Sequence, residues 1–144
     1  MYDLALALCK YAHDGQKDKG GNDYYLHPLA VSNAVTTEKE KVVALLHDVL
    51  EDTFVTQDTI KNLFGDEILE AVLSVTKREG EDYIDFVRRA KRNPIGRAVK
   101  IADIRNNMDL SRLSVVTNKD MMRMGKYQAA LEILNRKPPA IPYL

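Results

Sequence analysis

Residues 42–52, VVALLHDVLED, decide the fold class of this chain and carry its most reactive side chains. At about 100° per residue, the apolar side chains of this stretch fill one arc of roughly 160°, which predicts an amphipathic helix over residues 39–51. Four ionisable side chains fall on the opposite side: His47, Asp48, Glu51 and Asp52. A histidine beside an aspartate, with an acidic pair one turn further on, can place metal ligands next to a proton-transfer pair. Taken alone, the same residues could equally form a solvated acidic face at the end of a helix.

The helical period continues through the rest of the sequence. Further helices are predicted over residues 2–14 and 28–36, from Thr56 to Gly65, from Asp66 onward, around 83–90, from Pro94 to about 110, and around 124–134. No stretch shows the strict alternation of a half-buried strand. We therefore predict an all-α, single-domain fold of about seven or eight helices over residues 1–137. The prolines of residues 138–144 predict an irregular tail.

The composition argues against several classes of protein. Of 144 residues, 45% are hydrophobic and 29% charged, which is typical of a soluble globular domain. Because 21 basic residues balance 21 acidic ones, we expect neither a nucleic-acid polymer nor a membrane as partner. The single cysteine, Cys9, excludes an internal disulfide framework and is expected to be buried. No apolar run approaches the roughly 18 residues of a membrane span, and no secretory signal is visible, so we expect a cytoplasmic protein.

Two further residues add to the candidate site. His27 lies in the sequence YYLHP at the start of a predicted helix, and Asp103 lies in VKIADIRNN, in the middle of another. Each has a simpler interpretation on its own. His27 could be a turn or core histidine, and Asp103 could be ion-paired with the neighbouring Lys100 or Arg105.

Together, these residues resemble the H…HD…D signature of the HD superfamily of metal-dependent phosphohydrolases. The resemblance is closer still to the (p)ppGpp hydrolase domain of the Rel/Spo alarmone enzymes. The matching segments are AHDGQKDKGGNDYYLHPLAV, VVALLHDVLEDT, a following Gly-Asp-Glu with VTK, and VKIADIRNNM. They run from about residue 12 to residue 108, in the order and at the spacing that are typical of the family.

The resemblance implies a role for each matching residue. The implied metal ligands, which would hold one Mn²⁺ per chain, are His27, His47, Asp48 and Asp103. Glu51 and Asp52 match the acidic pair that activates water and transfers protons. Lys19 matches a lysine near the nucleotide, and Asn107 matches an asparagine near its ribose. The implied reaction is hydrolysis of the 3′-pyrophosphate of ppGpp or pppGpp, which yields GDP or GTP and pyrophosphate.

One position departs from the family pattern. The family usually has an arginine that stacks on guanine, followed by a lysine, where this chain has Asp18 and Lys19. A carboxylate cannot stack as a planar cation. The alternative that this chain is an HD phosphohydrolase acting on another phosphorylated nucleotide, such as NADPH, therefore stays open. A non-catalytic nucleotide-binding module is the other alternative, and it would show a damaged ligand set. A small nucleotide is the expected partner in each case, and the oligomeric state stays open.

Three smaller groups of residues have structural interpretations. His13 and Gln16 are predicted to fix a helix end and the following loop by hydrogen bonds. A solvated helix end is predicted for a basic run: Arg88, Arg89, Lys91 and Arg92. Core packing is predicted for a methionine cluster: Met121, Met122 and Met124.

Overall fold

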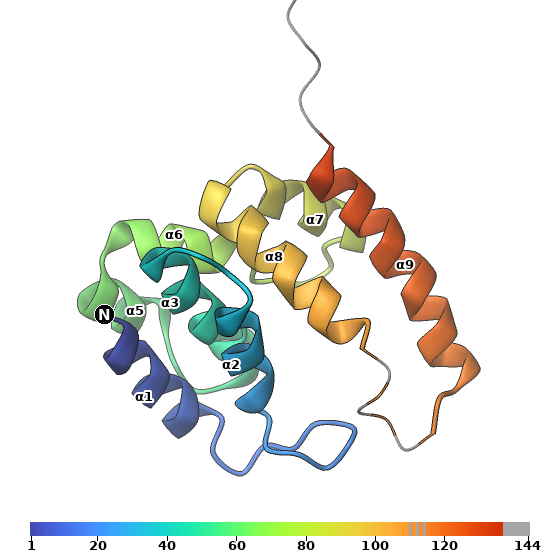
Figure 1. Ribbon diagram of the computed structural model, residues 1–144. Helices are drawn as coiled ribbons and strands as arrows, with labels where there is room; N and C mark the ends of the chain where they lie inside the picture. Colours follow the sequence, from blue (N-terminus) through green and yellow to red (C-terminus); the bar gives the residue numbers. More distant parts are fainter. Residues whose placement is uncertain (110, 112, 114, 137–144) are drawn as a thin grey trace, which may run out of the picture.

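The computed structural model describes residues 1–109, 111, 113 and 115–136. These residues form α-helices and contain no β-strand beyond one isolated bridge between Lys17 and Asp23 (Figure 1). The helices are α1 (Tyr2–Ala12), α2 (Leu26–Asn33), α3 (Glu38–Leu46), α4 (Val49–Asp52), α5 (Gln57–Phe64), α6 (Asp66–Ser74), α7 (Tyr83–Lys91), α8 (Pro94–Asn107) and α9 (Asn118–Asn135). The all-α prediction is confirmed, and the tail predicted over residues 138–144 lies outside the described residues.

Several helices begin at capping residues that are visible in the sequence. The Thr56 side chain accepts a backbone hydrogen bond at the start of α5, as expected of an N-cap. The Asn93 side chain does the same for α8, and Pro94 then occupies the first helical position. Gly65 separates α5 from α6 with a φ of +91°, a conformation that glycine adopts without a steric penalty. Local sequence therefore defines most helix boundaries.

The single helix predicted over residues 39–51 is interrupted by a turn. α3 and α4 are separated at His47 and Asp48, although neither residue is a strong helix breaker. The Nδ1–H of His47 donates to the Ala44 carbonyl at 2.5 Å, so a side chain takes up a carbonyl in the last turn of α3. The interpretation as a solvated acidic face is wrong for His47, which is only 3% exposed. The turn directs this histidine into the protein.

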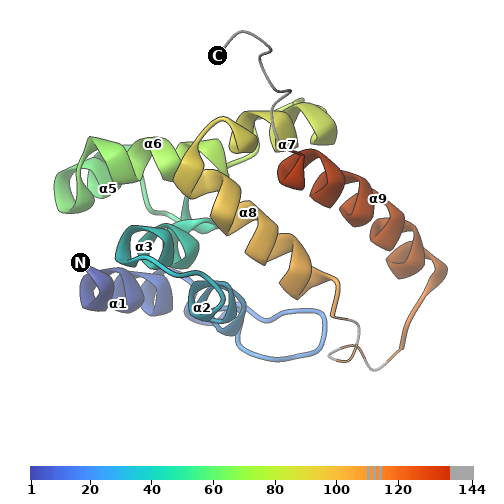
Figure 2. The same cartoon turned by 45° about the horizontal axis from the view of Figure 1, so that its top comes forward.

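α3 lies at the centre of the packing and contacts α1, α2, α6 and α8. Its apolar side chains belong to the main hydrophobic core, which also buries Cys9, as predicted. Burial raises the pKa of the Cys9 thiol to about 12, so this cysteine is unreactive. A second, smaller cluster joins α7, α8 and α9 through Val87, Ile104, Ala130 and Leu134. α8 lies between α3 and α9 (Figure 2) and contributes to both clusters, with Val99 and Ala102 in the first and Ile104 in the second.

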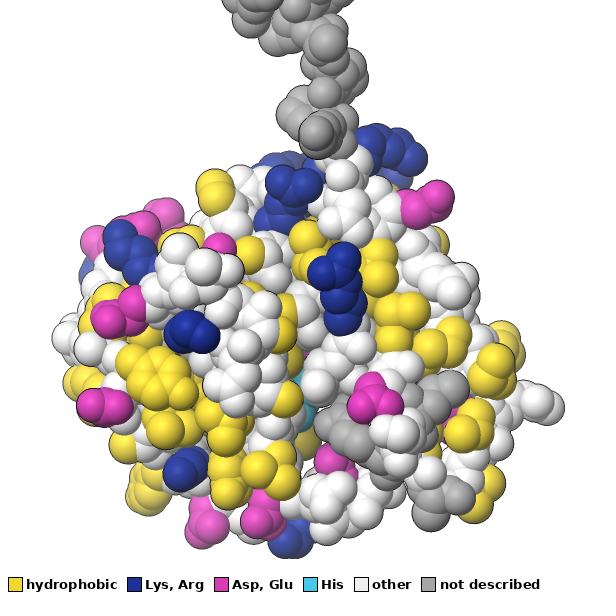
Figure 3. Space-filling model, viewed as in Figure 1, with side chains coloured by type: hydrophobic (Ala, Val, Ile, Leu, Met, Phe, Trp, Pro, Cys, Tyr) yellow, Lys and Arg dark blue, Asp and Glu magenta, His cyan; other side chains and the backbone are white. Residues whose placement is uncertain are grey.

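The surface agrees with the balanced composition. On the face shown in Figure 3, acidic and basic side chains are interspersed, and little histidine surface is visible. None of the helices in the described part of the chain combines the length and hydrophobicity needed to cross a membrane.

Two predictions about the surface are wrong. Arg89 is not solvated, because its side chain is 14% exposed and pairs with Glu81 at 2.9 Å. Met121 and Met122 do not pack in the core, since they are 56% and 77% exposed on the outer side of α9. Met124 lies beside a cavity instead.

Candidate metal centre and adjoining cavity

The four predicted metal ligands converge from three parts of the chain. α2 supplies His27, the turn between α3 and α4 supplies His47 and Asp48, and α8 supplies Asp103. Asp103 Oδ1 lies 2.8 Å from His27 Nε2 and 3.4 Å from His47 Nε2. His47 Nε2 also lies 3.1 Å from Asp48 Oδ2. The folded chain thus brings together side chains that are up to 76 residues apart in the sequence.

Each histidine of this cluster is oriented through its outer nitrogen. His47 Nδ1–H donates to the Ala44 carbonyl at 2.5 Å, and His27 Nδ1–H donates to Asn106 Oδ1 at 2.6 Å. With Nδ1 occupied in both rings, the two Nε2 atoms face Asp103. Metal-binding histidines are commonly held in this way, because the outer hydrogen bond fixes both the tautomer and the direction of the free nitrogen.

The donor set fits a divalent cation. One ligand atom from each of His27, His47 and Asp103 lies within 4.8 Å of the others, and all three residues are buried. His47 Nε2 is completely enclosed and has no aligned hydrogen-bond partner among the described residues. A buried nitrogen without a partner is destabilising, and a bound cation would satisfy it. Imidazole nitrogens combined with carboxylate oxygens suit a first-row divalent metal.

The carboxylates of the cluster are held in their charged form. Burial alone would raise the pKa of Asp103, but Lys100, 3.2 Å away, and His47 hold it well below its usual range. Burial likewise opposes ionisation of Asp48, and His47 outweighs it, so the pKa of Asp48 is lowered. The Tyr24 hydroxyl donates to Asp48 Oδ2 at 2.5 Å. Neighbouring positive charge therefore favours the ionised form of both aspartates, and a bound cation would supply this charge in place of a protonated His47.

The predicted acidic pair lies beside this cluster, on its exposed side. Carboxylate oxygens of Asp48, Glu51 and Asp52 lie within 4.8 Å of one another. Partial burial raises the pKa of Glu51, although a hydrogen bond from the Lys77 amide opposes this. Partial burial and the charge of Asp48 raise the pKa of Asp52. Carboxyl groups with raised pKa values exchange protons closer to neutral pH, as general acids and bases do.

The loop before α2 is tied to the acidic pair. His13 is buried and its Nδ1 lies 2.8 Å from Gln16 Oε1, which agrees with the predicted structural role. Gln16 Nε2 in turn donates to the Asp52 carbonyl at 2.9 Å. These two hydrogen bonds connect the end of α1 to the end of α4.

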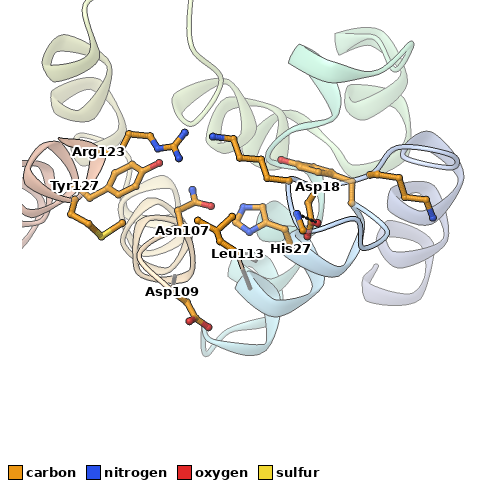
Figure 4. A pocket seen from close by; sticks show the side chains of 12 residues that line it. Asp18, His27, Asn107, Asp109, Leu113, Arg123 and Tyr127 are labelled. Carbon is orange, nitrogen blue, oxygen red and sulfur yellow. Dashed lines mark hydrogen bonds between the residues drawn. The ribbon is translucent and has the colours of Figure 1, made fainter. Parts of the chain in front are cut away.

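A cavity of about 320 Å³ adjoins the cluster and shares His27 with it. The predicted substrate residues Lys19 and Asn107 both line this cavity. Asn107 Nδ2 also donates to Asp103 Oδ1 at 3.2 Å, so it links the cavity to the cluster. Arg123 and Tyr127 of α9 line the cavity near Asn107, across from Asp18 (Figure 4).

Cationic side chains gather at this cavity. Burial and the nearby positive charges of Arg123 and Lys119 lower the pKa of Lys19. Arg123 is itself ion-paired with Asp120. Positive charges brought together from the loop and from α9 repel one another, and an anionic ligand between them would relieve this repulsion.

Sequence reasoning missed three residues that support this site: Tyr24, Asn106 and Arg123. Asn106 follows Asp103 by three positions on α8, a spacing that puts both on one face, and this signal could have identified it. Tyr24 lies one turn before His27 and is marked by no comparable pattern. Arg123 belongs to a helix that is distant in sequence, and no local pattern links it to the cavity.

Comparison with known proteins defines the class of this domain. Residues 5–116 match the HD domain family. Because this match covers most of the chain, the protein belongs to the HD domain family.

Among proteins of this kind, the relatives found act on guanosine nucleotides. The chain is 32% identical to the guanosine-3′,5′-bis(diphosphate) 3′-pyrophosphohydrolase of Aquifex aeolicus (strain VF5) over 116 residues, or 72% of this chain and 17% of that protein. It is 34% identical to a probable GTP pyrophosphokinase of Mycobacterium leprae (strain TN) over 120 residues, or 72% of this chain and 15% of that protein. The chain therefore spans less than a fifth of these relatives' length.

A solved structure supports the fold independently. It is described as a metazoan orthologue of SpoT that hydrolyses ppGpp and plays a role in starvation responses. The two structures align with a TM-score of 0.79 over 93% of this chain and 85% of the other chain, at 21% sequence identity. At this identity the likeness defines the helical arrangement.

Proposed function

We propose that residues 1–137 form a metal-dependent pyrophosphohydrolase that removes the 3′-pyrophosphate of ppGpp or pppGpp. One water molecule adds to the phosphorus on the ribose 3′-oxygen, the bond from this phosphorus to the 3′-oxygen breaks, and the products are GDP or GTP and pyrophosphate. The observation that carries the proposal is the buried cluster of His27, His47 and Asp103 beside a cavity large enough for part of a nucleotide. The names of the relatives support the same substrate.

Four residues would hold the cation, for which we propose one Mn²⁺ per chain: His27, His47, Asp48 and Asp103. When bound, this cation supplies Lewis-acid activation of water and of the attacked phosphate. Asn106 and the Ala44 carbonyl keep the two imidazoles aimed at one point. Lys100 balances part of the negative charge that Asp103 adds to the buried site.

Glu51 and Asp52 are proposed to carry the proton. The attacking water loses a proton as it bonds to phosphorus, and the leaving 3′-oxygen gains one. A carboxyl group beside the ligand cluster, with a pKa above its usual value, suits both transfers. The Lys77 amide holds the Glu51 carboxylate in place, which favours Glu51 as the first acceptor.

Lys19, Arg123 and Asn107 are proposed to hold the substrate. Lys19 and Arg123 enter the cavity from different elements and suit the charged phosphates. Asn107 lies between the cavity and Asp103, where an amide can meet a ribose hydroxyl. Since the substrate is a small nucleotide, we also propose that the enzyme acts in the cytoplasm.

Hydrolysis with identified products tests this function. The purified protein, supplied with Mn²⁺, is incubated separately with ppGpp, pppGpp, GTP and NADPH, and the products are separated by anion-exchange chromatography. Rapid, chelator-sensitive formation of GDP and pyrophosphate from ppGpp is the expected result. Release of single phosphates, or faster turnover of NADPH than of ppGpp, would contradict the proposal.

A further inference from the structure

The loop before α2 is held in one conformation by its own side chains. Asp18 Oδ1 accepts hydrogen bonds from the backbone amides of Gly20 and Asn22, each at 2.9 Å. Lys17 forms an ion pair with Asp23 across the same loop. These contacts hold the Asp18 carboxylate at a defined position relative to the backbone. The second oxygen of Asp18 is therefore aimed in a defined direction as well.

That second oxygen is available for a ligand. Asp18 is half-buried and lines the cavity, on the side opposite Arg123 and Tyr127 (Figure 4). Both loop hydrogen bonds are made by Oδ1, and Oδ2 has no hydrogen-bond or ion-pair partner among the described residues. His27, at the edge of the ligand cluster, lines the same cavity. A molecule that fills the cavity next to the cluster would thus meet a free carboxylate oxygen.

The chemistry of a carboxylate restricts what can lie against it. An ionised carboxylate accepts hydrogen bonds only, and it repels phosphate groups. Lys19 and Arg123, elsewhere in the cavity, are the better contacts for the phosphates of a nucleotide. The base is then the part of the nucleotide left for Asp18. Guanine presents two adjacent donors, N1–H and the 2-amino group, whereas adenine presents an amino group next to the unprotonated N1, an acceptor.

We propose that Asp18 determines base specificity, by accepting a hydrogen bond at Oδ2 from the donor edge of guanine and by disfavouring the N1 acceptor of adenine. This inference rests on the proposed function, because it places the base of the proposed substrate in this cavity. Recognition of the edge of the base takes the place of stacking on its face. The carboxylate, which is unsuited to stacking, is well suited to this contact.

One substitution separates base recognition from the structural role of Asp18. Asp18→Asn retains a carbonyl oxygen for the Gly20 and Asn22 amides but replaces the free oxygen with an amide NH₂, which is a donor. It should therefore keep the loop and lose the contact with guanine. Asp14→Asn is the matched control, because Asp14 is exposed, lies shortly before Asp18 in the same segment and does not line the cavity. Equal melting temperatures for the wild type and Asp18→Asn would show that the loop is retained.

The experiment compares kcat/KM for ppGpp and for its adenosine analogue, with the Mn²⁺-supplied protein. The wild type and Asp14→Asn should prefer ppGpp, and in Asp18→Asn the preference should fall by about tenfold to a hundredfold, as expected for loss of a charge-assisted hydrogen bond. A wild type that turns over both nucleotides equally would overturn the inference without touching the proposed function. A preference that survives in Asp18→Asn would overturn it too.

If the wild type hydrolyses neither nucleotide, the proposed function fails and binding still tests Asp18. Calorimetric titration with GDP and with ADP then replaces the kinetic comparison. Tighter binding of GDP by the wild type, with the difference lost in Asp18→Asn, would support the inference. Equal affinities of the wild type for the two nucleotides, or an unchanged difference in the variant, would overturn it.

Discussion

In the described part of the chain, the partly buried Arg89–Glu81 ion pair and the buried ligand cluster around Asp103 differ in how their polar atoms are paired. In the Arg89–Glu81 pair, the guanidinium makes two hydrogen bonds of 2.9 Å to the carboxylate and donates to the Leu73 and Thr76 carbonyls at 2.7 Å each. Arg89 accordingly holds the pKa of Glu81 at about 2. In the ligand cluster around Asp103, by contrast, His47 Nε2 is buried without an aligned partner in the described part of the chain.

The difference distinguishes a structural ion pair from a binding site. The hydrogen-bond donors of Arg89 are paired with atoms of the same chain, and these bonds fix the segment between α6 and α7. The cluster at Asp103 directs ring nitrogens and carboxylate oxygens at one another, an arrangement that favours a cation from outside. The first cluster should therefore matter for stability and the second for metal binding and turnover. Four substitutions test this division, in order of decreasing effect.

Asp48→Ala should have the largest effect. Removing a charged ligand atom beside His47 should remove the metal and lower ppGpp turnover by about 10⁴-fold or more, since the chemistry depends on the cation. Metal content after dialysis and the rate of ppGpp hydrolysis check this. Asp58→Ala, an exposed change in α5, is the control. Full metal content in Asp48→Ala would remove Asp48 from the ligand set.

Glu51→Gln should affect turnover and spare the metal. The amide keeps an oxygen for the Lys77 amide but cannot take a proton, so kcat should fall about a thousandfold, within the usual range for general acid–base residues. Single-turnover kinetics and metal analysis on the same sample separate the two properties. Glu70→Gln, on the exposed side of α6, serves as control. A variant with wild-type kcat would exclude Glu51 from proton transfer.

Arg89→Met should lower the stability of the fold and leave metal binding unchanged. It leaves Glu81 and two carbonyls without their partner and should lower the free energy of unfolding by about 3 kcal/mol. Urea denaturation measures this, while metal content per folded chain should stay unchanged. Arg88→Met is the matched control, because Arg88 is 60% exposed and its removal should cost less than about 0.5 kcal/mol. Loss of metal from folded Arg89→Met would break the division between the two clusters.

Asn106→Ala should have the smallest effect of the four. Without the acceptor for His27 Nδ1, the ring loses its fixed orientation, and metal affinity should fall about tenfold, as when an outer hydrogen bond of a metal ligand is removed. Competition with a chelator measures the affinity. Asn106→Asp keeps the acceptor oxygen and should restore the affinity. Equal affinity in Asn106→Ala and the wild type would show that His27 is oriented by other contacts.

Much of the fold follows from local sequence, but the break between α3 and α4 does not. Thr56 and the Asn93-Pro94 pair act on neighbouring backbone, so their effects are visible in the sequence. The turn at His47 contains neither glycine nor proline, and it lies at the end of α3, which packs against α2 and α8. Tertiary packing therefore overrides helical periodicity at the position where the ligands are needed.

The residues of the site, like the helices, could be predicted only where a pattern in the sequence marks them. The family resemblance identified the side chains that converge at Asp103. The residues that orient them were missed: the spacing of Asn106 from Asp103 is visible in the sequence, but no local pattern marks its contact with His27, 79 positions away. Met121 was predicted to pack in the core but is exposed, since an apolar side chain on a helix does not reveal whether a neighbouring element covers it.

The wide spacing of the ligands has a consequence for folding. Closing a chain segment of 76 residues between His27 and Asp103 carries a loop entropy cost, so this pairing should be a late step in refolding. A cation that binds only the completed arrangement stabilises the native chain by mass action. Metal supply would then govern the lifetime of the folded enzyme as well as its rate of turnover.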